Sequence, residues 1–282
     1  MADDALADFT RERFTHGGRA HTVLRSGRGP AVIVMAEIPG ITPKVARFAR
    51  RVRDIGCTVV LPDLFGVAGR DPDPAAHGWA GTAVTGLRAG ARICVSREFT
   101  VLAAGRTSPV VTWLRALAVH EHERCGGPGV GAVGMCFTGG YALAMATDER
   151  LLAPVLCQPS LPLAVSARNR RSLDISPADL RTVQQRCEAG LTVLGLRFRG
   201  DRLVPGERFA LLREKLGEAF VGIELDDSTA NPDAFTAPHS TVTEHLVDEP
   251  GHPTRQALEQ VLDHLRTRLL TPLPDHPAGS PA

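Results

Sequence analysis

The sequence predicts an α/β protein with a mostly parallel central sheet and helices on both faces. Short apolar runs of strand length, such as residues 31–36 and 57–61, alternate along the chain with longer segments of helical periodicity. This alternation is typical of strand–helix–strand units, in which a crossover helix joins two parallel strands. Parallel strands are covered on both faces, which explains why the runs are apolar throughout.

Composition and charge indicate a globular chain that can bury a large core. The 282 residues are 43% hydrophobic, and the formal net charge of +1 comes from interspersed basic and acidic side chains. Such a balance argues against a nucleic-acid or anionic membrane partner. The sequence has no apolar run of membrane-spanning length and its first eight residues are acidic, unlike a signal peptide, so we expect a cytoplasmic protein.

The expected elements follow along the chain. Residues 1–20 are polar and are expected to form a loosely attached lead-in, with a short edge strand at 22–24. Later strands are expected over 31–36, 57–61, 129–135, 151–157, 191–198 and 220–225, and helices over 43–56, 109–124, 139–147, 176–190, 208–216 and 254–269. Thr42, Ser108 and Ser176 each precede a proline and are expected to cap helices.

We expect a single domain over residues 1–270. An irregular helical excursion at 66–107 interrupts the regular alternation, with a proline turn at 71–74. A connection of this length either carries the substrate side of a site or is a surface insertion, and the sequence leaves both open. The proline-rich tail, residues 271–282, is expected to be disordered.

Cys136 lies where a predicted strand meets a predicted helix, in the run Gly134-Met-Cys-Phe-Thr-Gly-Gly140. A nucleophile on such a turn is exposed at the edge of the sheet, and a helix N-terminus favours a thiolate. A lone cysteine is more often a small buried hydrophobe. A catalytic interpretation therefore needs a base, an acid and oxyanion donors elsewhere in the chain.

An acid and a base follow Cys136 in the chain. Asp201 comes directly after the strand at 191–198, where it can orient an imidazole or close an Asx turn. Three histidines come later, at positions 239, 245 and 252. We favour His239 over His245 as the base, because a loop just beyond a strand end can reach the turn, although a structural role is open for each.

Glu37 directly follows the strand at 31–36 and so lies at the same edge of the sheet as Cys136. A carboxylate beside Cys136 disfavours the thiolate by like charge, unless it shares a proton or moves when substrate arrives. The backbone N–H groups of Ile38 and Phe137 are the expected oxyanion donors. An ordinary loop carboxylate is the alternative interpretation of Glu37.

These motifs, taken together and in this order, resemble those of the dienelactone hydrolase family. They are Glu37-Ile-Pro-Gly40, Pro62-Asp-Leu-Phe65, Gly134 to Gly140, Gly200-Asp-Arg-Leu-Val-Pro205 and His239-Ser240. The resemblance implies an α/β-hydrolase fold, no cofactor, and hydrolysis of an ester or lactone through a thioester acyl-enzyme. It also implies that Cys136 is the nucleophile, Asp201 the acid and His239 the base, and that Glu37 contacts the resting cysteine.

Two features depart from the family pattern. The usual turn is Gly-x-Cys-x-Gly-Gly, and here Thr138 adds a residue before the glycine pair. In the best-known members an arginine just after the Pro-Asp-Leu-Tyr segment grips the substrate carboxylate. Here Arg70 is displaced from that place, and Arg97, Arg106 and Arg202 are the other candidates for substrate binding.

A second class of function stays open from the sequence. The fold can serve as a non-catalytic binding or regulatory module, or Cys136 can act as a redox-sensing thiol. A serine esterase is disfavoured, because the sequence contains no Gly-x-Ser-x-Gly. A metal site is not indicated either, since the cysteines lack a short repeated spacing and His120 and His122 point to different faces of a helix. The expected partner is a small ester or lactone, with the oligomeric state left unpredicted.

Overall fold

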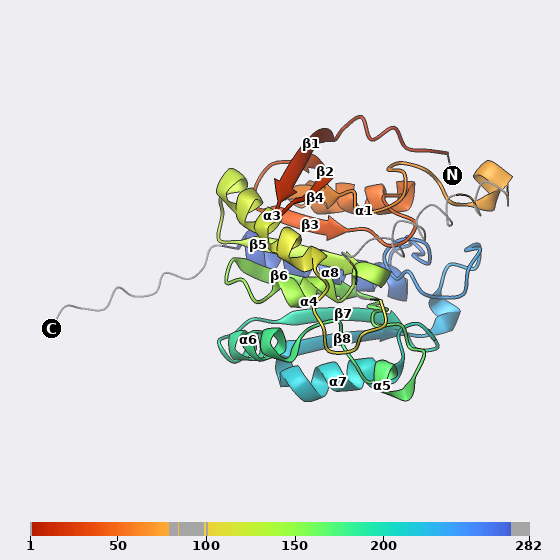
Figure 1. Cartoon of the computed structure of the whole chain (residues 1–282). Coiled ribbons are helices and arrows are strands. Elements are labelled where there is room, and N and C mark those ends of the chain that lie inside the picture. Colours follow the sequence, from red (N-terminus) through yellow and green to blue (C-terminus); the bar gives the residue numbers. More distant parts are fainter. Residues whose placement is uncertain (1, 79–83, 85–98, 100, 272–282) are drawn as a thin grey trace.

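A single sheet of eight strands forms the centre of the protein (Figure 1). The computed structural model describes residues 2–78, 84, 99 and 101–271. The strands are β1 (Thr10–His16), β2 (Arg19–Gly27), β3 (Ala31–Met35), β4 (Thr58–Pro62), β5 (Val130–Met135), β6 (Leu151–Cys157), β7 (Val193–Phe198) and β8 (Phe220–Leu225). The helices are α1 (Pro43–Asp54), α3 (Val110–Cys125), α4 (Tyr141–Met145), α5 (Ala167–Arg170), α6 (Pro177–Glu188), α7 (Gly206–Leu216) and α8 (Pro253–Leu269), and short 3₁₀ turns include Cys136–Thr138.

The sheet has the order β1-β2-β4-β3-β5-β6-β7-β8 and is mostly parallel. Neighbouring strands from β4 through β8 pair in parallel, whereas β2 pairs antiparallel with both β1 and β4. Every residue of β3, β4 and β5 is buried, as expected for strands covered on both faces. The predicted mostly parallel α/β sheet is thus confirmed.

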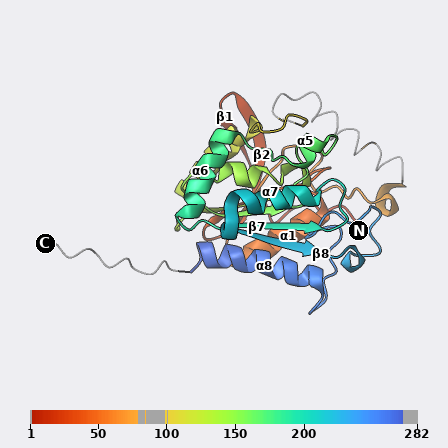
Figure 2. The same cartoon turned by 90° about the horizontal axis from the view of Figure 1, so that it is seen from below.

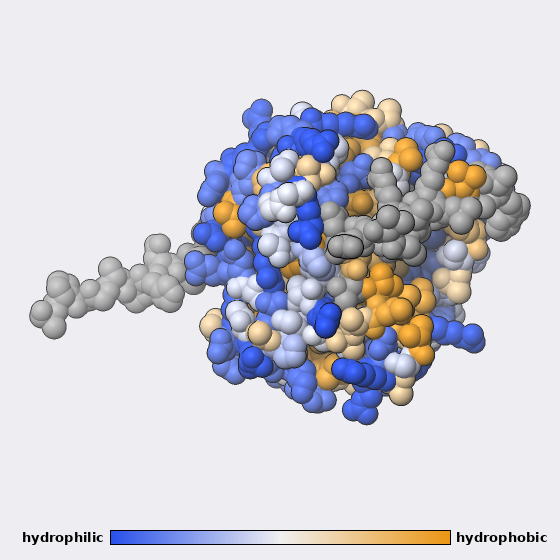
Figure 3. Space-filling view, viewed as in Figure 1, coloured by the Kyte–Doolittle hydropathy of each residue, from blue (hydrophilic) through white to orange (hydrophobic). Residues whose placement is uncertain are grey.

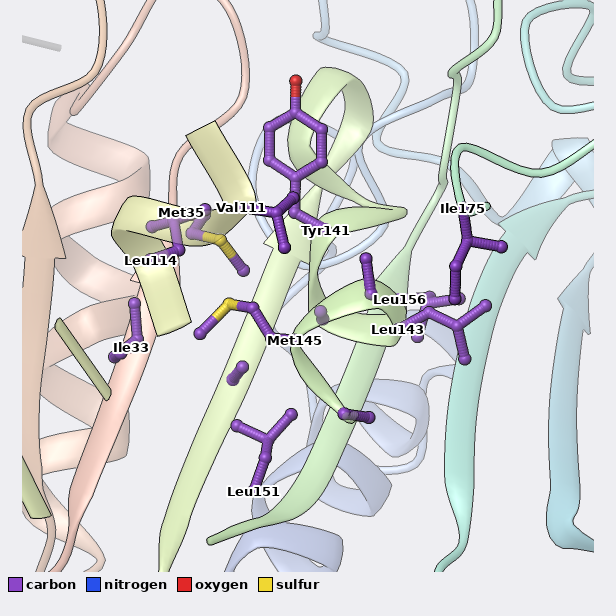
Figure 4. Close-up of a cluster of buried hydrophobic side chains, with 14 of the residues drawn as sticks. Ile33, Met35, Val111, Leu114, Tyr141, Leu143, Met145, Leu151, Leu156 and Ile175 are labelled. Atoms are coloured by element: carbon purple, nitrogen blue, oxygen red, sulfur yellow. The ribbon is translucent and has the colours of Figure 1, made fainter. Parts of the chain in front are cut away.

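Helices cover both faces of the sheet. Helices α1 and α8 pack on one face, and α3, α4, α6 and α7 contribute to the core on the other (Figure 2). Figure 4 shows part of the core on the face that α3, α4, α6 and α7 cover. There, Met145 of α4 lies between Ile33 and Met35 of β3 and Leu151 of β6. In the same view Tyr141 points along the strands toward their carboxyl ends.

The N-terminal segment is more ordered than the sequence predicts, and the expectation of a loose lead-in at 1–20 is wrong. Strand β1 pairs with β2 along its whole length, and Leu6 and Phe9 are buried. Arg50 of α1 also binds the Asp4 and Asp8 carboxylates. The prediction failed because the side chains of β1 are mostly exposed, so its backbone pairing leaves no apolar alternation in the sequence.

Two of the three predicted helix caps are confirmed. The Thr42 hydroxyl accepts a hydrogen bond from Val45 N, and the Ser176 hydroxyl accepts one from Asp179 N. Ser108 does not cap α3, which starts after Pro109 without a side-chain cap. Its hydroxyl instead lies 3.1 Å from the Asp174 carboxylate, because both side chains are buried and satisfy each other there.

The carboxyl ends of the parallel strands meet at one edge of the sheet, where hydrophobic surface also gathers (Figure 3). Most of the predicted excursion at 66–107 lies outside the described residues, but its first part, including Asp71, reaches this edge. The predicted tail from residue 272 also lies outside them, and the single domain over 1–270 stays a prediction. Within the described part of the chain, no helix has the length and apolar character that crossing a bilayer requires.

Asp174 makes the stability of this fold dependent on pH. Burial raises the pKa of Asp174 from 3.8 to about 7, although the Ser108 hydroxyl and Arg208 oppose the shift. Because the folded state favours the neutral acid, its contribution is fully present below about pH 4 and is lost as the pH rises through 7. Relative to wild type, Asp174→Asn should therefore gain stability by on the order of a few kcal/mol between pH 4 and 8.

Urea unfolding of wild type and of Asp174→Asn at several pH values measures the difference in their free energy of unfolding. Glu218→Gln, which changes an exposed carboxylate, should follow the wild-type pH profile. A constant difference between Asp174→Asn and wild type across this pH range would contradict the assignment.

Candidate active site

Cys136 occupies a strained turn between β5 and α4. Its φ is +52°, in the left-handed region that non-glycine residues rarely adopt. The turn is close-packed: a Cβ at Gly134 would lie 2.2 Å from Thr138 O, and one at Gly139 would lie 2.5 Å from the Pro159 Cα. Glycine at these two positions therefore lets the turn close and leaves Cys136 at the edge of the sheet.

Thr138, the residue added to the family pattern, braces this turn. Its buried hydroxyl accepts a hydrogen bond from Met135 N at 2.9 Å and lies 2.8 Å from Met35 O, to which it can donate. Met135 ends β5 and Met35 ends β3, so the hydroxyl joins the two central strands at their carboxyl ends. The additional residue fastens the turn to the sheet, so the lengthened motif still closes.

Asp201 and His239 meet beside this turn, as the sequence predicts. His239 Nδ1 lies 2.6 Å from Asp201 Oδ2, and the other carboxylate oxygen accepts a hydrogen bond from Leu203 N. The two side chains come from the loop after β7 and from the long loop after β8. His239 Nε2 is buried and, unlike Nδ1, is not engaged by Asp201. Nε2 is thus the nitrogen left to exchange a proton.

Charge around His239 stabilises its imidazolium form. Burial lowers the pKa of His239, but interactions with Cys136 and Asp201 outweigh it, so that the pKa lies well above its ordinary value. Cys136 makes the largest of the contributions that raise this pKa. The structure therefore brings the predicted nucleophile, base and acid together in the order Cys136, His239, Asp201.

The two other candidate histidines have structural contacts. His245 is buried, with Nδ1 accepting from Ser240 N at 3.1 Å and Nε2 placed 3.0 Å from Thr236 O. Its ring therefore ties together the loop that carries His239. His252 caps α8 by accepting a hydrogen bond from Thr254 N.

Glu37 is held by donors other than Cys136. Its buried carboxylate accepts hydrogen bonds from the hydroxyls of Ser240 and Thr243 and from Gln158 Nε2. Gln158 Oε1 in turn accepts from Thr241, so Glu37 anchors the histidine loop to the ends of β3 and β6. The expected contact between Glu37 and the resting cysteine is not among its hydrogen bonds in this conformation.

Ser160 is a neighbour of Cys136 that the sequence analysis missed. Its hydroxyl lies 3.6 Å from Cys136 Sγ, and its backbone N–H donates to Cys136 O. The side chain is buried and comes from the loop after β6. Only a weak signal pointed to it, namely the position of Gln158-Pro-Ser160 at the end of a predicted strand.

A cavity of about 400 Å³ opens onto Cys136 and His239. Glu37 and Ile38 line it from the loop after β3, and Asp71 and Pro72 line it from the start of the excursion. Further walls come from Leu203 after β7 and from residues 235–244. Of the expected oxyanion donors, Ile38 is on the cavity wall, while Phe137 is buried behind Cys136 against Phe65, Phe99 and Tyr141.

The predicted arginines do not line this cavity where they are described. Arg70 is half-buried, Arg106 and Arg202 are exposed, and Arg97 lies outside the described residues. The one lysine or arginine on the described wall is Lys44 of α1, whose Nζ lies 2.7 Å from Glu244 Oε2. Sequence reasoning missed this pair because its two residues are 200 positions apart in unrelated segments.

A metal centre has no support in the described part of the chain. No group of three or more His, Cys, Asp or Glu side chains there is placed to hold a metal ion. The polar groups of the site are instead a thiol, an imidazole, carboxyls and hydroxyls. These are the groups of acid–base and nucleophilic chemistry.

Solved structures of other proteins resemble this chain in fold. The α/β hydrolase GrgF from Penicillium sp. sh18 superposes with a TM-score of 0.58 at 16% identity, covering 93% of this chain and 99% of that one. The dienelactone hydrolase-like promiscuous phosphotriesterase P91 from metagenomic libraries gives a TM-score of 0.55 at 19% identity, covering 93% and 98%. These likenesses establish the α/β-hydrolase fold.

Sequence comparison gives the family itself. No match is found among curated protein sequences. The sequence model of the dienelactone hydrolase family matches residues 18–268, which include every motif named above. The chain belongs to the dienelactone hydrolase family.

Proposed function

We propose that this protein hydrolyses a carboxylic ester or lactone with Cys136 as the nucleophile. The observation that carries the proposal is the Cys136, His239 and Asp201 constellation at the floor of a cavity, on a turn whose backbone is strained. Membership of a hydrolase family supports the same reaction class. The cavity has the size of a small-molecule site.

The reaction proceeds in two halves. His239 Nε2 takes the proton of Cys136, and the thiolate attacks the ester carbonyl to form a tetrahedral intermediate. When the carbon–oxygen bond breaks, His239 returns the proton to the leaving alcohol and a thioester remains on Cys136. Water, deprotonated by His239, then attacks the thioester and releases the acid and the thiol. Asp201 holds the imidazole in one orientation and stabilises its charged form throughout.

The backbone N–H groups of Ile38 and Phe137 stabilise the oxyanion. Both residues directly follow a site residue, Glu37 and Cys136, at the carboxyl ends of adjacent strands β3 and β5. Preorganised donors of this kind lower the barrier most when water is excluded. The hydrogen bonds of Glu37 to Ser240, Thr243 and Gln158 support this by fixing the loop that carries Ile38.

Replacing Cys136 by alanine should abolish turnover of p-nitrophenyl acetate, with kcat/KM falling by at least about a thousandfold, because no other group can form the thioester. Cys187→Ala, which removes a half-buried thiol on α6, serves as the matched control. Circular dichroism and urea unfolding confirm that both variants fold. Undiminished turnover by Cys136→Ala would overturn the nucleophile. Rapid alkylation of Cys136 in a wild-type protein that never forms an acyl adduct would favour the thiol-sensor alternative.

Replacing His239 by alanine should lower kcat/KM by about 10³–10⁴-fold while leaving the unfolding midpoint close to wild type, because this half-buried ring acts as base. His245→Ala should instead lower the unfolding midpoint first, since that ring holds backbone groups of the loop. Added imidazole provides the distinguishing measurement. It should partly restore His239→Ala and leave His245→Ala unchanged, and the reverse pattern would make His245 the base.

A further inference from the structure

The charged side chains of the cavity wall are unevenly divided between the two signs. Three carboxyl groups, those of Glu37, Asp71 and Glu244, share the described wall with one ammonium group, that of Lys44, and with the His239 ring, which Asp201 already pairs. Lys44 is already paired, with its Nζ 2.7 Å from Glu244 Oε2 and only 21% and 15% of the two side chains exposed. Glu37 is held by hydroxyl and amide donors, and none of the hydrogen-bond partners given for it is a cation. The described wall is therefore formally acidic.

One carboxylate oxygen of Glu244 accepts no hydrogen bond within the described structure. This oxygen, Oε1, is also buried. A buried oxygen in this state attracts a donor and repels a second carboxylate. A substrate group reaching this part of the wall is therefore favoured when it is uncharged or carries a donor.

The mouth of the cavity is apolar. Ile38, Leu203 and Phe235 line it and belong to the exposed large hydrophobic side chains of the described chain, at 39%, 47% and 39%. They come from three different loops, so their meeting around one opening is a property of the fold. Exposed apolar side chains gathered at an opening are typical of a binding site.

We propose, on the basis of the proposed ester hydrolysis, that the cavity selects uncharged, apolar esters and discriminates against those that carry a free carboxylate. Lys44 and Glu244 set this specificity. Glu244 neutralises Lys44, the one lysine or arginine on the described wall that could receive a substrate carboxylate, and Glu37 and Asp71 add repulsion. The pair thus acts on the choice of substrate and takes no part in the bond-making steps.

The test uses two aryl esters of equal chain length, p-nitrophenyl hexanoate and p-nitrophenyl hydrogen adipate. Wild type should show a kcat/KM at least tenfold higher for the neutral ester. In Glu244→Gln the ammonium of Lys44 is released, and the ratio of the anionic to the neutral kcat/KM should rise at least fivefold. That rise should disappear in the double variant Lys44→Met/Glu244→Gln and shrink at high salt. Glu218→Gln, an exposed carboxylate change, should leave the ratio at the wild-type value.

The outcomes separate the two proposals. Equal or faster hydrolysis of the adipate ester by wild type, or a ratio that does not respond to Glu244→Gln, would overturn the specificity inference and leave ester hydrolysis standing. Turnover of neither ester by wild type would overturn ester hydrolysis, and the inference with it.

Discussion

The hydroxyl of Thr138 is the contact on which the geometry of the site depends. It joins the last residue of β5 to the last residue of β3, and these two strands deliver Cys136 and Glu37 to the same edge of the sheet. A turn with φ of +52° at a cysteine persists only if surrounding contacts hold it. Thr138 supplies such a contact from within the turn itself, and Gly134 and Gly139 make room for it.

A second side chain, the buried guanidinium of Arg208, holds the segments that follow β6 and β7. Arg208 donates hydrogen bonds to five backbone carbonyls, those of Pro159, Pro162, Asn169, Ser172 and Leu203. These carbonyls belong to the segment between β6 and α6, which includes α5, and to the loop between β7 and α7; the same two segments carry Ser160 and Asp201. Burial lowers the pKa of Arg208 to about 10, but the Asp174 and Asp201 carboxylates oppose this and favour the charged form. The loops that meet at Cys136 are therefore held by one side chain of α7.

The sequence predicted the parts of the protein whose physics is local. Apolar runs gave the central strands, Thr42 and Ser176 gave helix starts, and the positions of Asp201 and His239 after strand ends brought them to the correct edge. Strand β1 was missed because its stability comes from backbone pairing with β2, which leaves no side-chain pattern.

Contacts between distant segments escaped prediction for a related reason. The Lys44–Glu244 pair and the Ser160 hydroxyl beside Cys136 depend on where loops cross after folding. The spacing of residues along the sequence does not show which loops will lie side by side in the folded protein. Ser108 was wrongly predicted as a helix cap for the same reason. Its sequence position suits a cap, but its hydroxyl contacts Asp174, a buried residue that is remote in sequence.

The surroundings of Cys136, the proposed nucleophile, differ from those that the sequence predicts. The sequence predicts that a helix N-terminus directly after Cys136 favours a thiolate. Helix α4 has only five residues and follows a 3₁₀ turn, so the dipole next to Cys136 is that of little more than one helical turn. A more direct influence lies among the site residues themselves, because Cys136 and Asp201 raise the pKa of His239 and so favour its imidazolium form. The Ser160 hydroxyl, 3.6 Å from the sulfur, is a further polar neighbour of Cys136. The polar surroundings of Cys136 therefore come from the loops that bring these groups together more than from the helix that follows it.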